Sequence, residues 1–336
     1  MSHRVLIPLD MEAPPRVPPG ALTHRLGGAT MGTSWSVQAL APRSVPRECI
    51  EAAITAQLQR VIDEMSTWQP DSVISVFNLA PAGSWHALPP AFCAVLDAAQ
   101  TMAIDSDGAF DPTVGPLVDV WGFGPGSAPL KEGLRLPDAA LLQATRARCG
   151  WQRIEFDRAA GKIRQPGGLT LDFSGIAKGH AVDLVAQALR EAGCVSWLAE
   201  VGGELSGWGV KEDGQPYWVA LERPPQDPGA GMTVALHGLA VATSGDYRRY
   251  FDHQGRRYAH TLDPRTGEPV RHALASVTVL HRQCMVADAL ATVLTVMGES
   301  AGLAFARQRG IAALFIASQE EGYRETLTPA LAAMLE

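Results

Sequence analysis

Two oxygen-bearing side chains four residues apart are the clearest sign of chemistry in this chain. Asp288 and Thr292 interrupt the apolar run 286–292, which has the composition of a buried helix. A spacing of four stacks both side chains on one helical face. A buried carboxylate is costly without a partner, and Mg²⁺ prefers oxygen ligands of this kind. The pair therefore predicts a magnesium site, with a helix cap or a structural ion pair as the alternative.

A second polar segment, Leu-Asp-Phe-Ser-Gly-Ile-Ala-Lys-Gly-His at 171–180, leads from a predicted strand into a predicted helix. Ser174 and Gly175 fall where the unpaired N–H groups of a helix point outward, which favours anion binding. Lys178, one turn later, adds positive charge for a phosphate. Asp172 either accepts a hydrogen bond from a ligand or caps the helix. The alternative is a capped surface helix with a solvated lysine.

Three further features leave two interpretations open. His260 precedes a turn with Asp263 and Arg265, which suits acid–base or phosphate chemistry, although a lone histidine is more often structural. The glycine pair 202–203 is either a hairpin turn or a close approach of backbone to a flat ligand. The aromatic residues near Trp68 and in the segment 108–124 are either walls for a stacked heterocycle or core.

These residues need a scaffold, and hydrophobic periodicity indicates one. Helices are expected at 47–65, 90–104, 139–147 with Asp138 as N-cap, 175–192, around Ala287, at 299–308 and weakly at the C-terminus. Strands are expected at 33–40, 152–157, 162–165, 169–173, 196–201, 204–210, 216–222, 232–236, 239–243, 257–262, 274–280 and 311–317. This irregular order predicts an α+β fold with mixed, largely antiparallel sheets and packed helices. The proline-rich residues 1–28 are expected to be an extended or disordered arm, and 29–336 a single large domain.

Composition narrows the function. The chain has 336 residues, 46% hydrophobic and 19% charged, as in ordinary globular proteins. A net charge of −7 argues against nucleic acid as a partner. The five cysteines form no CxxC pair, no signal-like or lipidation segment opens the chain, and no apolar run approaches the roughly 20 residues of a membrane span. We expect a cytoplasmic protein with no membrane span.

Taken together, these motifs resemble the ApbE-like FAD:protein FMN transferase family. The resemblance runs from Met31 to Thr292 in one order, which is far more specific than any single motif. The motifs that carry it are Met31-Gly32-Thr33, Met65-Ser66-Thr67-Trp68, Phe110-Asp111-Pro112-Thr113-Val114-Gly115-Pro116, Trp121-Gly122-Phe123-Gly124, 172–179, Gly202-Gly203-Glu204, 242–247, 260–267 and 287–292.

The resemblance implies an ApbE-like flavin transferase fold that holds FAD as substrate, with Mg²⁺ at its pyrophosphate. Asp288, Thr292 and the main-chain oxygen of Gly175 match the metal ligands of the family, and His260 and Lys178 its catalytic positions. The implied contacts to the flavin nucleotide are Met31, Trp68, Ala109, Phe110, Asp111, Asp172, Lys178 and Leu262. Trp68 departs from the family, because a tyrosine often stands there.

The implied activity is Mg²⁺-dependent transfer of FMN from FAD to a threonine or serine of an acceptor protein, through a phosphoester bond and with release of AMP. The implied partners are therefore FAD and an acceptor protein with a Thr/Ser flavinylation motif. Two alternatives stay open at this point. One is a Mg²⁺-dependent FAD pyrophosphatase that forms FMN and AMP, and the other is a non-catalytic flavin-binding protein.

Overall fold

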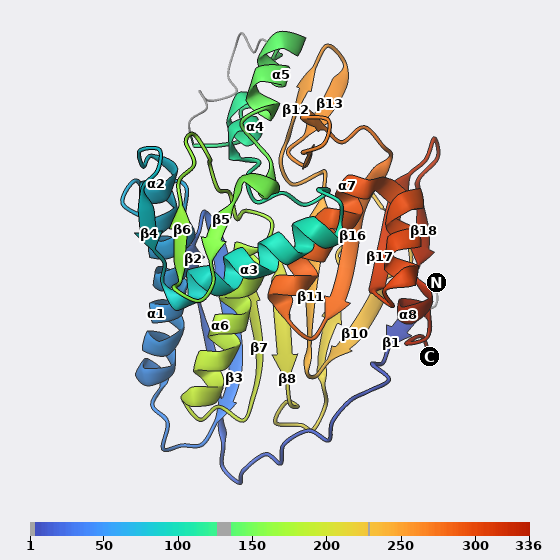
Figure 1. Ribbon diagram of the computed structural model, residues 1–336. Coiled ribbons are helices and arrows are strands. Elements are labelled where there is room, and N and C mark those ends of the chain that lie inside the picture. The colour runs from blue at the N-terminus through green and yellow to red at the C-terminus, as the bar shows by residue number, and fades with distance from the viewer. Residues whose placement is uncertain (1–3, 126–135, 228) are drawn as a thin grey trace. The chain divides into compact units, whose positions relative to one another are not determined.

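The computed structural model describes residues 4–125, 136–227 and 229–336 (Figure 1). The chain divides into two compact units. The first comprises Met1–Arg60, Lys178–Gly245 and Ala273–Glu336, and the second comprises Val61–Ala177 and Asp246–His272. Both contain helices and strands in irregular order, and their strand pairs are almost all antiparallel. The predicted α+β class with largely antiparallel sheets is confirmed.

The first unit is built on one eight-stranded antiparallel sheet. Its strand order is β18 (Tyr323–Leu327), β17 (Ala312–Ser318), β16 (Leu274–His281), β11 (Leu239–Gly245), β8 (Glu204–Trp208), β7 (Ser196–Val201), β3 (Thr33–Ala41) and β2 (Leu22–Thr30). Met31–Gly32 joins β2 to β3, and Gly202–Gly203 joins β7 to β8. All four residues have positive φ (45°, 71°, 63° and 101°), as type I′ hairpin turns require. The hairpin interpretation of the glycine pair is therefore confirmed.

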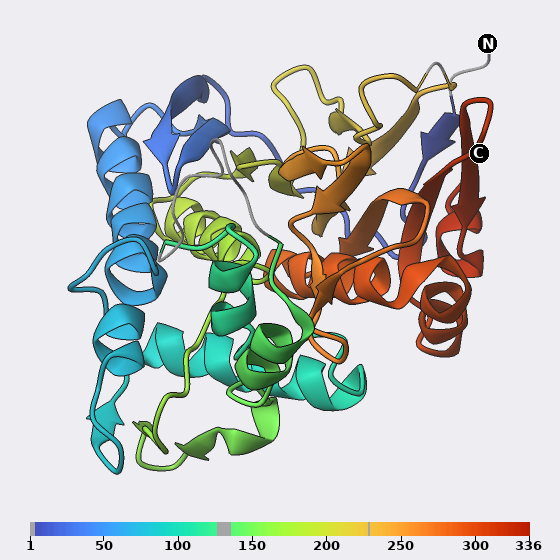
Figure 2. The same ribbon diagram turned by 90° about the horizontal axis from the view of Figure 1, so that it is seen from above.

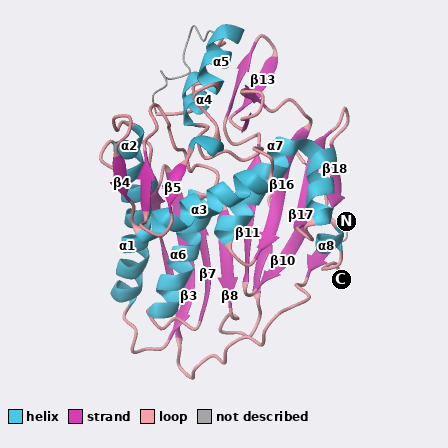
Figure 3. Ribbon diagram, in the orientation of Figure 1, coloured by secondary structure: helices cyan, strands magenta, loops and turns pink. Residues whose placement is uncertain are grey.

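Layers cover both faces of this sheet. The helices α6 (Ala177–Glu191) and α7 (Cys284–Gln308) lie on one face (Figures 1 and 3). On the other, a small sheet with the order β1 (Arg4–Leu6), β10 (Met232–Leu236) and β9 (Tyr217–Ala220) shares an apolar core with β11, β16 and β17. Because β16 is covered on both sides, seven of its eight residues are buried.

The helix α7, orange in Figure 2, packs against β11 and β16. It is apolar almost all round, as a core helix is. Among the described residues it is the one helix long and apolar enough to cross a bilayer by length and composition, and 56% of its most apolar window is buried inside the structure. Gly298, with φ 76° and ψ 172°, interrupts it and separates the two predicted helical segments.

The first unit also contains the N-terminal residues and two further helices, of which the longer one ends with residues 61–65 in the second unit. The helix α1 (Arg47–Met65) has the predicted bounds, and α8 (Pro329–Ala332) is the short C-terminal helix. Met1 to His3 lie outside the described residues. Within the predicted N-terminal arm, β1 pairs with β10, and the side chain of Leu6 is fully buried in the core beneath the sheet.

Except for one helix of 16 residues, the second unit is made of short elements. Its elements are α2 (Val73–Asn78), β4 (Trp85–Ala87), α3 (Pro90–Asp105), α4 (Gly115–Val120), α5 (Ala139–Arg146), the 3₁₀ helix η1 (Trp151–Arg153), β5 (Glu155–Asp157), β6 (Lys162–Arg164), β12 (Tyr250–His253), β13 (Arg256–Ala259), β14 (Leu262–Asp263) and β15 (Glu268–Pro269). The predicted N-cap is confirmed, because Asp138 accepts from the N–H of Leu141.

The predicted strand at 169–173 is wrong. The side chain of Asn78 bonds both the N–H and the carbonyl of Leu171, and the N–H of Asp172 donates to the carbonyl of Pro112. These contacts hold the segment extended and buried outside any sheet ladder. Its apolar pattern therefore reported burial and not strand pairing.

Candidate functional site

In the first unit, α6 crosses α7 at Gly179. A Cβ atom at this position would lie 2.3 Å from the carbonyl oxygen of Cys284 and 2.8 Å from the Cβ of Asp288. Only glycine permits so close an approach of the two backbones. The approach also lets the N–H of Gly179 donate to Oδ2 of Asp288 across 3.0 Å. The α6 backbone thus holds the carboxylate that was predicted to bind metal.

The predicted oxygen pair on α7 lies where the helix faces α6 and β11. The Asp288 side chain is buried, with only 4% of the residue exposed. The hydroxyl of Thr292 lies 3.4 Å from the Ser244 hydroxyl at the end of β11. No cluster of three or more His, Cys, Asp or Glu side chains suited to a metal occurs in the described part of the chain. The donors here are one carboxylate and one hydroxyl, the hard oxygens that suit Mg²⁺ when a substrate supplies the remainder.

Lys178 brings a positive charge to the same place. Its Nζ lies 2.6 Å from Oε1 of Glu204, at the start of β8, and 3.8 Å from Oδ1 of Asp288. Glu204 is 1% exposed and the Lys178 side chain 31% exposed. Lys178 is therefore not a solvated surface lysine. The structure brings three of the predicted residues together here, namely Lys178, Asp288 and Thr292.

Asp183 is a second carboxylate at this crossing, and sequence reasoning missed it. Its two oxygens accept from the N–H groups of Cys284 and Met285, at 2.8 and 2.9 Å, and so cap the first turn of α7 from α6. Burial, with a smaller contribution from the charge of Asp288, raises the pKa of Asp183 to about 6, although the two hydrogen bonds oppose the rise. The signal in the sequence was an acidic residue one turn after Gly179, inside a largely apolar helix.

In the second unit, Asp111 is a buried carboxylate with several donors. Oδ1 accepts from the N–H and the hydroxyl of Thr113, at 2.8 and 2.7 Å, and Oδ2 accepts from the N–H of Trp151 at 3.2 Å. Burial raises the pKa of Asp111, and these hydrogen bonds oppose the rise. The Thr113 hydroxyl in turn accepts from the N–H of Gly150. Asp111 therefore fixes the segment around residue 150 as well as standing at a predicted nucleotide contact.

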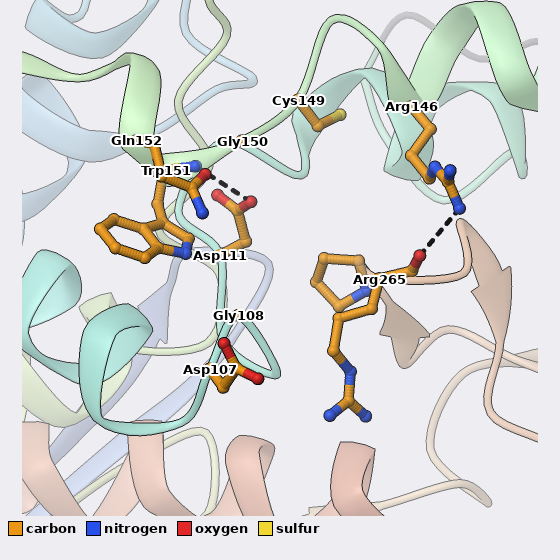
Figure 4. Close-up of a pocket in the computed structure, with 10 residues that line it drawn as sticks. Asp107, Gly108, Asp111, Arg146, Cys149, Gly150, Trp151, Gln152 and Arg265 are labelled. Carbon is orange, nitrogen blue, oxygen red and sulfur yellow. Dashed lines mark hydrogen bonds between the residues drawn. The ribbon is translucent and has the colours of Figure 1, made fainter.

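Asp111 also lines a cavity of about 200 Å³, shown in Figure 4. The opposite wall carries Arg146 and Arg265, and a guanidinium nitrogen of Arg146 donates to the Arg265 carbonyl at 2.9 Å. The Arg265 guanidinium points away from Arg146 (Figure 4). It pairs with Asp263. The cavity is thus lined by charges of both signs and is not a simple anion site.

Ala109, Phe110 and Asp172, the predicted contacts near Asp111 in the second unit, are all buried. The side chains of Ala109 and Phe110 are buried, and the N–H of Phe110 donates to the Ser106 hydroxyl. The buried Asp172 accepts from the N–H of Ser174 at 2.7 Å, which closes the turn that contains Gly175. Asp172 is therefore a turn-forming residue here.

His260 and Leu262 flank an aromatic cluster of the second unit. Leu262 packs with Leu117, Trp121, Phe123 and Tyr258. The Phe123 and His260 rings meet edge to face, with centroids 6.3 Å apart. Nδ1 of His260 lies 2.9 Å from the Arg249 carbonyl oxygen, so Nδ1 carries the hydrogen in this contact. Nε2 is then the nitrogen able to accept a proton.

Trp68 and Met31 are the two remaining predicted contacts. Trp68 is 64% exposed, beyond the end of α1, which excludes the alternative that it is core. Met31 occupies the β2–β3 turn with φ 45°, a conformation rare for residues other than glycine. Such strain is often found at functional positions.

Comparison with known proteins gives the family. The ApbE family model matches residues 31–315, and the chain belongs to this family. The chain is 38% identical over 304 residues to an FAD:protein FMN transferase of Vibrio cholerae, covering 89% of each protein. It is 33% identical over 322 residues to the FAD:protein FMN transferase of Salmonella typhimurium, covering 95% of this chain and 91% of that protein.

Solved structures agree on the fold. The apo form of the flavinyl transferase ApbE of Pseudomonas stutzeri superposes with a TM-score of 0.86 at 39% identity, covering 94% of this chain and 97% of that one. The flavin transferase ApbE of Vibrio cholerae gives a TM-score of 0.85 at 35% identity, covering 94% and 99%. The predicted ApbE-like flavin transferase fold is confirmed.

Proposed function

We propose that this chain is an FAD:protein FMN transferase, which moves FMN from FAD to a threonine or serine hydroxyl of an acceptor protein and releases AMP. Similarity to transferases of that name over nearly the whole chain supports the proposal. The observation within the structure that carries it is the buried Asp288 carboxylate, one helical turn from the Thr292 hydroxyl and beside the Lys178 ammonium. Simple flavin binding requires no such set.

Asp288 and Thr292 are the proposed side-chain ligands of Mg²⁺. The fit rests on chemistry, because the buried Asp288 carboxylate accepts from the Gly179 N–H and has the Lys178 ammonium 3.8 Å away, and a hard cation would add a direct partner for it. The bound ion supplies charge neutralisation at phosphate oxygens. The main-chain oxygen of Gly175 is proposed as a third ligand on the basis of the family resemblance alone. Lys178 adds positive potential for phosphate oxygens.

The proposed contacts with the flavin nucleotide are Met31, Trp68, Ala109, Phe110, Asp111, Asp172, Lys178 and Leu262. Exposure of Trp68 supports a stacking role. Because the side chains of Ala109 and Phe110 are buried, their proposed contacts are made by main-chain atoms. These assignments otherwise rest on the resemblance.

His260 is the proposed general base. With Nδ1 hydrogen-bonded to the Arg249 carbonyl, Nε2 accepts the proton of the acceptor hydroxyl. The acceptor oxygen forms a bond to the flavin-side phosphorus as the bond from that phosphorus to the bridging oxygen breaks. AMP departs with that oxygen. The products are a flavin phosphoester on the acceptor, AMP, and a proton on His260.

The test is transfer itself. The protein is incubated with FAD, Mg²⁺ and an acceptor domain that carries a Thr/Ser flavinylation segment. The expected result is fluorescent, covalently labelled acceptor and AMP in equal amounts. FMN released equally fast without acceptor would favour the pyrophosphatase, and intact FAD after prolonged incubation would favour a flavin-binding protein.

A variant tests the metal assignment. Asp288→Ala is expected to lower Mg²⁺-dependent transfer by at least about 100-fold, because the residue supplies the charged ligand. The exposed Asp213→Ala serves as a control for loss of one carboxylate in the same unit. Full activity of a folded Asp288→Ala protein at ordinary Mg²⁺ concentration would refute the assignment.

We also propose that residues 29–336 act as one functional domain and that transfer takes place in the cytoplasm. The acceptor is then a cytoplasmic protein or the cytoplasmic face of a membrane complex. Protease protection of a tagged protein in intact cells tests the location. Cleavage by protease added outside the cytoplasmic membrane would contradict it.

A further inference from the structure

Lys178 stands between two buried carboxylates at unequal distances. Its ammonium is 2.6 Å from Glu204 and 3.8 Å from Asp288. The shorter distance is that of a charge-assisted hydrogen bond, and the longer one exceeds hydrogen-bonding distance. The lysine is therefore held by Glu204 and only faces Asp288.

Glu204 is not among the proposed metal ligands or nucleotide contacts, yet its carboxylate is buried. A glutamate that is 1% exposed is rare unless it is paired. The ammonium of Lys178 meets that need. Because a lysine side chain is long and flexible, it adopts another partner when its preferred one is lost.

We propose that Glu204 is a positioning residue that keeps the Lys178 ammonium away from Asp288, so that the Asp288 carboxylate remains available to a divalent cation. This inference rests on the proposed function, since it concerns the same metal site. Glu204 acts through Lys178 and touches neither the metal nor the nucleotide in this role.

The fold places Glu204 rigidly for this task. Glu204 pairs with Val201 across the two-residue turn of Gly202 and Gly203, which fixes where β8 begins. A Cβ atom at Gly202 would lie 3.3 Å from Cδ of Lys178 and 3.0 Å from Cγ2 of Thr33. The absence of a side chain there leaves the path along which the lysine reaches Glu204. The tight glycine turn thus serves the lysine contact as well as the hairpin.

Removing the Glu204 charge changes the balance of contacts. In Glu204→Gln the ammonium loses its charged partner, and Asp288 is the buried carboxylate next in reach. A direct Lys178–Asp288 pair then competes with the cation for the carboxylate. Divalent cation affinity is expected to fall about tenfold or more, because a buried ion pair must be broken for binding.

The experiment is a double-mutant cycle on Mn²⁺ binding, followed by the electron paramagnetic resonance signal of free Mn²⁺. The proteins are unaltered, Glu204→Gln, Lys178→Met and the double variant. If charge alone matters, Lys178→Met raises Mn²⁺ affinity by the same factor in both backgrounds. If Glu204 positions the lysine, the factor is at least about fivefold larger in the Glu204→Gln background. Equal factors would overturn the proposal.

A matched control lies on the same hairpin. Glu200 on β7 accepts from the Ser36 hydroxyl and from the N–H of Gly203. Gln at this position can accept from the Gly203 N–H through Oε1 and donate its amide N–H to the Ser36 hydroxyl. Glu200→Gln removes one negative charge near the turn and is expected to leave Mn²⁺ affinity within about twofold. An equal loss in Glu200→Gln and Glu204→Gln would reduce the effect to general charge and overturn the positioning role.

A variant that fails to fold can be distinguished from a wrong positioning role and from a wrong proposed function. If Glu204→Gln does not fold, Glu204→Asp, which keeps the charge on a shorter side chain, replaces it in the cycle with a smaller expected coupling. Failure of FMN transfer alone would refute the proposed function and leave the coupling measurable. Absence of Mn²⁺ binding by the unaltered protein, both with and without FAD, would refute the metal assignment and the positioning role together.

Discussion

The contact between α6 and α7 makes Gly179→Ala a severe test of the site. The added Cβ would lie 2.3 Å from the Cys284 carbonyl oxygen, whereas ordinary contact begins at 3.4 Å. The helices must therefore separate by roughly 1 Å in a close-packed interior. Such overpacking costs about 1–3 kcal/mol. Weakening the hydrogen bond from the Gly179 N–H to the Asp288 carboxylate adds about 1.5–3 kcal/mol to this loss of stability.

The summed loss of unfolding free energy is about 2.5–6 kcal/mol, which corresponds to a fall in melting temperature of roughly 4–9 °C for a chain of this size. Calorimetry measures this fall, and Mn²⁺ titration at a temperature where the variant is folded measures the displacement of Asp288. Gly302→Ala, also on α7, is the matched control. Its Cβ would lie 3.0 Å from the Leu294 carbonyl oxygen, so a loss below about 2 kcal/mol and unchanged Mn²⁺ affinity are expected. Equal melting temperatures for Gly179→Ala and the unaltered protein would refute the close-contact reasoning.

Three other perturbations have defined outcomes. The pKa of Asp183 is raised from 3.8 to about 6 in the folded protein, so the stability that Asp183 contributes falls as the pH rises between these values. In urea unfolding, the free energy of unfolding relative to Asp183→Asn is expected to be about 1 kcal/mol larger at pH 5 than at pH 7. A difference that does not change with pH would contradict this. His260→Ala is expected to lower single-turnover FMN transfer by about 100-fold or more with FAD affinity retained, and unchanged turnover would remove the general base. Since Trp68 is 64% exposed, Trp68→Ala is expected to weaken FAD binding about tenfold in a fluorescence titration, with an unchanged melting temperature; a large loss of stability would show that it packs.

The sequence predicted those parts of the fold that local pattern determines. The apolar spacing in 47–65 gave α1 its observed bounds, and Asp138 was recognisable as a cap because its role depends on neighbours three residues away. The segment 169–173 failed because its partners, Asn78 and Pro112, are distant in sequence and replace a ladder. An apolar run indicates that a segment is buried. Which groups bond to its backbone N–H and C=O groups depends on tertiary contacts.

The candidate site divides in the same way. Asp288 and Thr292 were identifiable because two oxygens at helical spacing stand out in an apolar run, and the order of family motifs added Lys178. Glu204 follows the glycine pair directly in the sequence, but its contact with Lys178 was not predicted. Lys178 is 26 positions away, and only the fold brings the two side chains together. Asp183 was hidden for the same reason. Pairings between elements are invisible to local patterns, and these residues make such pairings.

The crossing of α6 and α7 also explains how the site keeps its register. Hydrogen bonds join the helices at two points, between Gly179 and Asp288 and between Asp183 and the N–H groups of Cys284 and Met285. Gly179 and Asp183 are four positions apart on α6, and Cys284 and Asp288 are four positions apart on α7. A slip of α7 by one residue would rotate its side chains by about 100° and break both contacts at once. Asp183 therefore fixes the rotation of α7 that aims Asp288, even though it lies a full turn from the oxygens that it orients. The proposed metal site is held by the packing of two helices in the core, and substitutions at the crossing are expected to alter cation affinity and stability together.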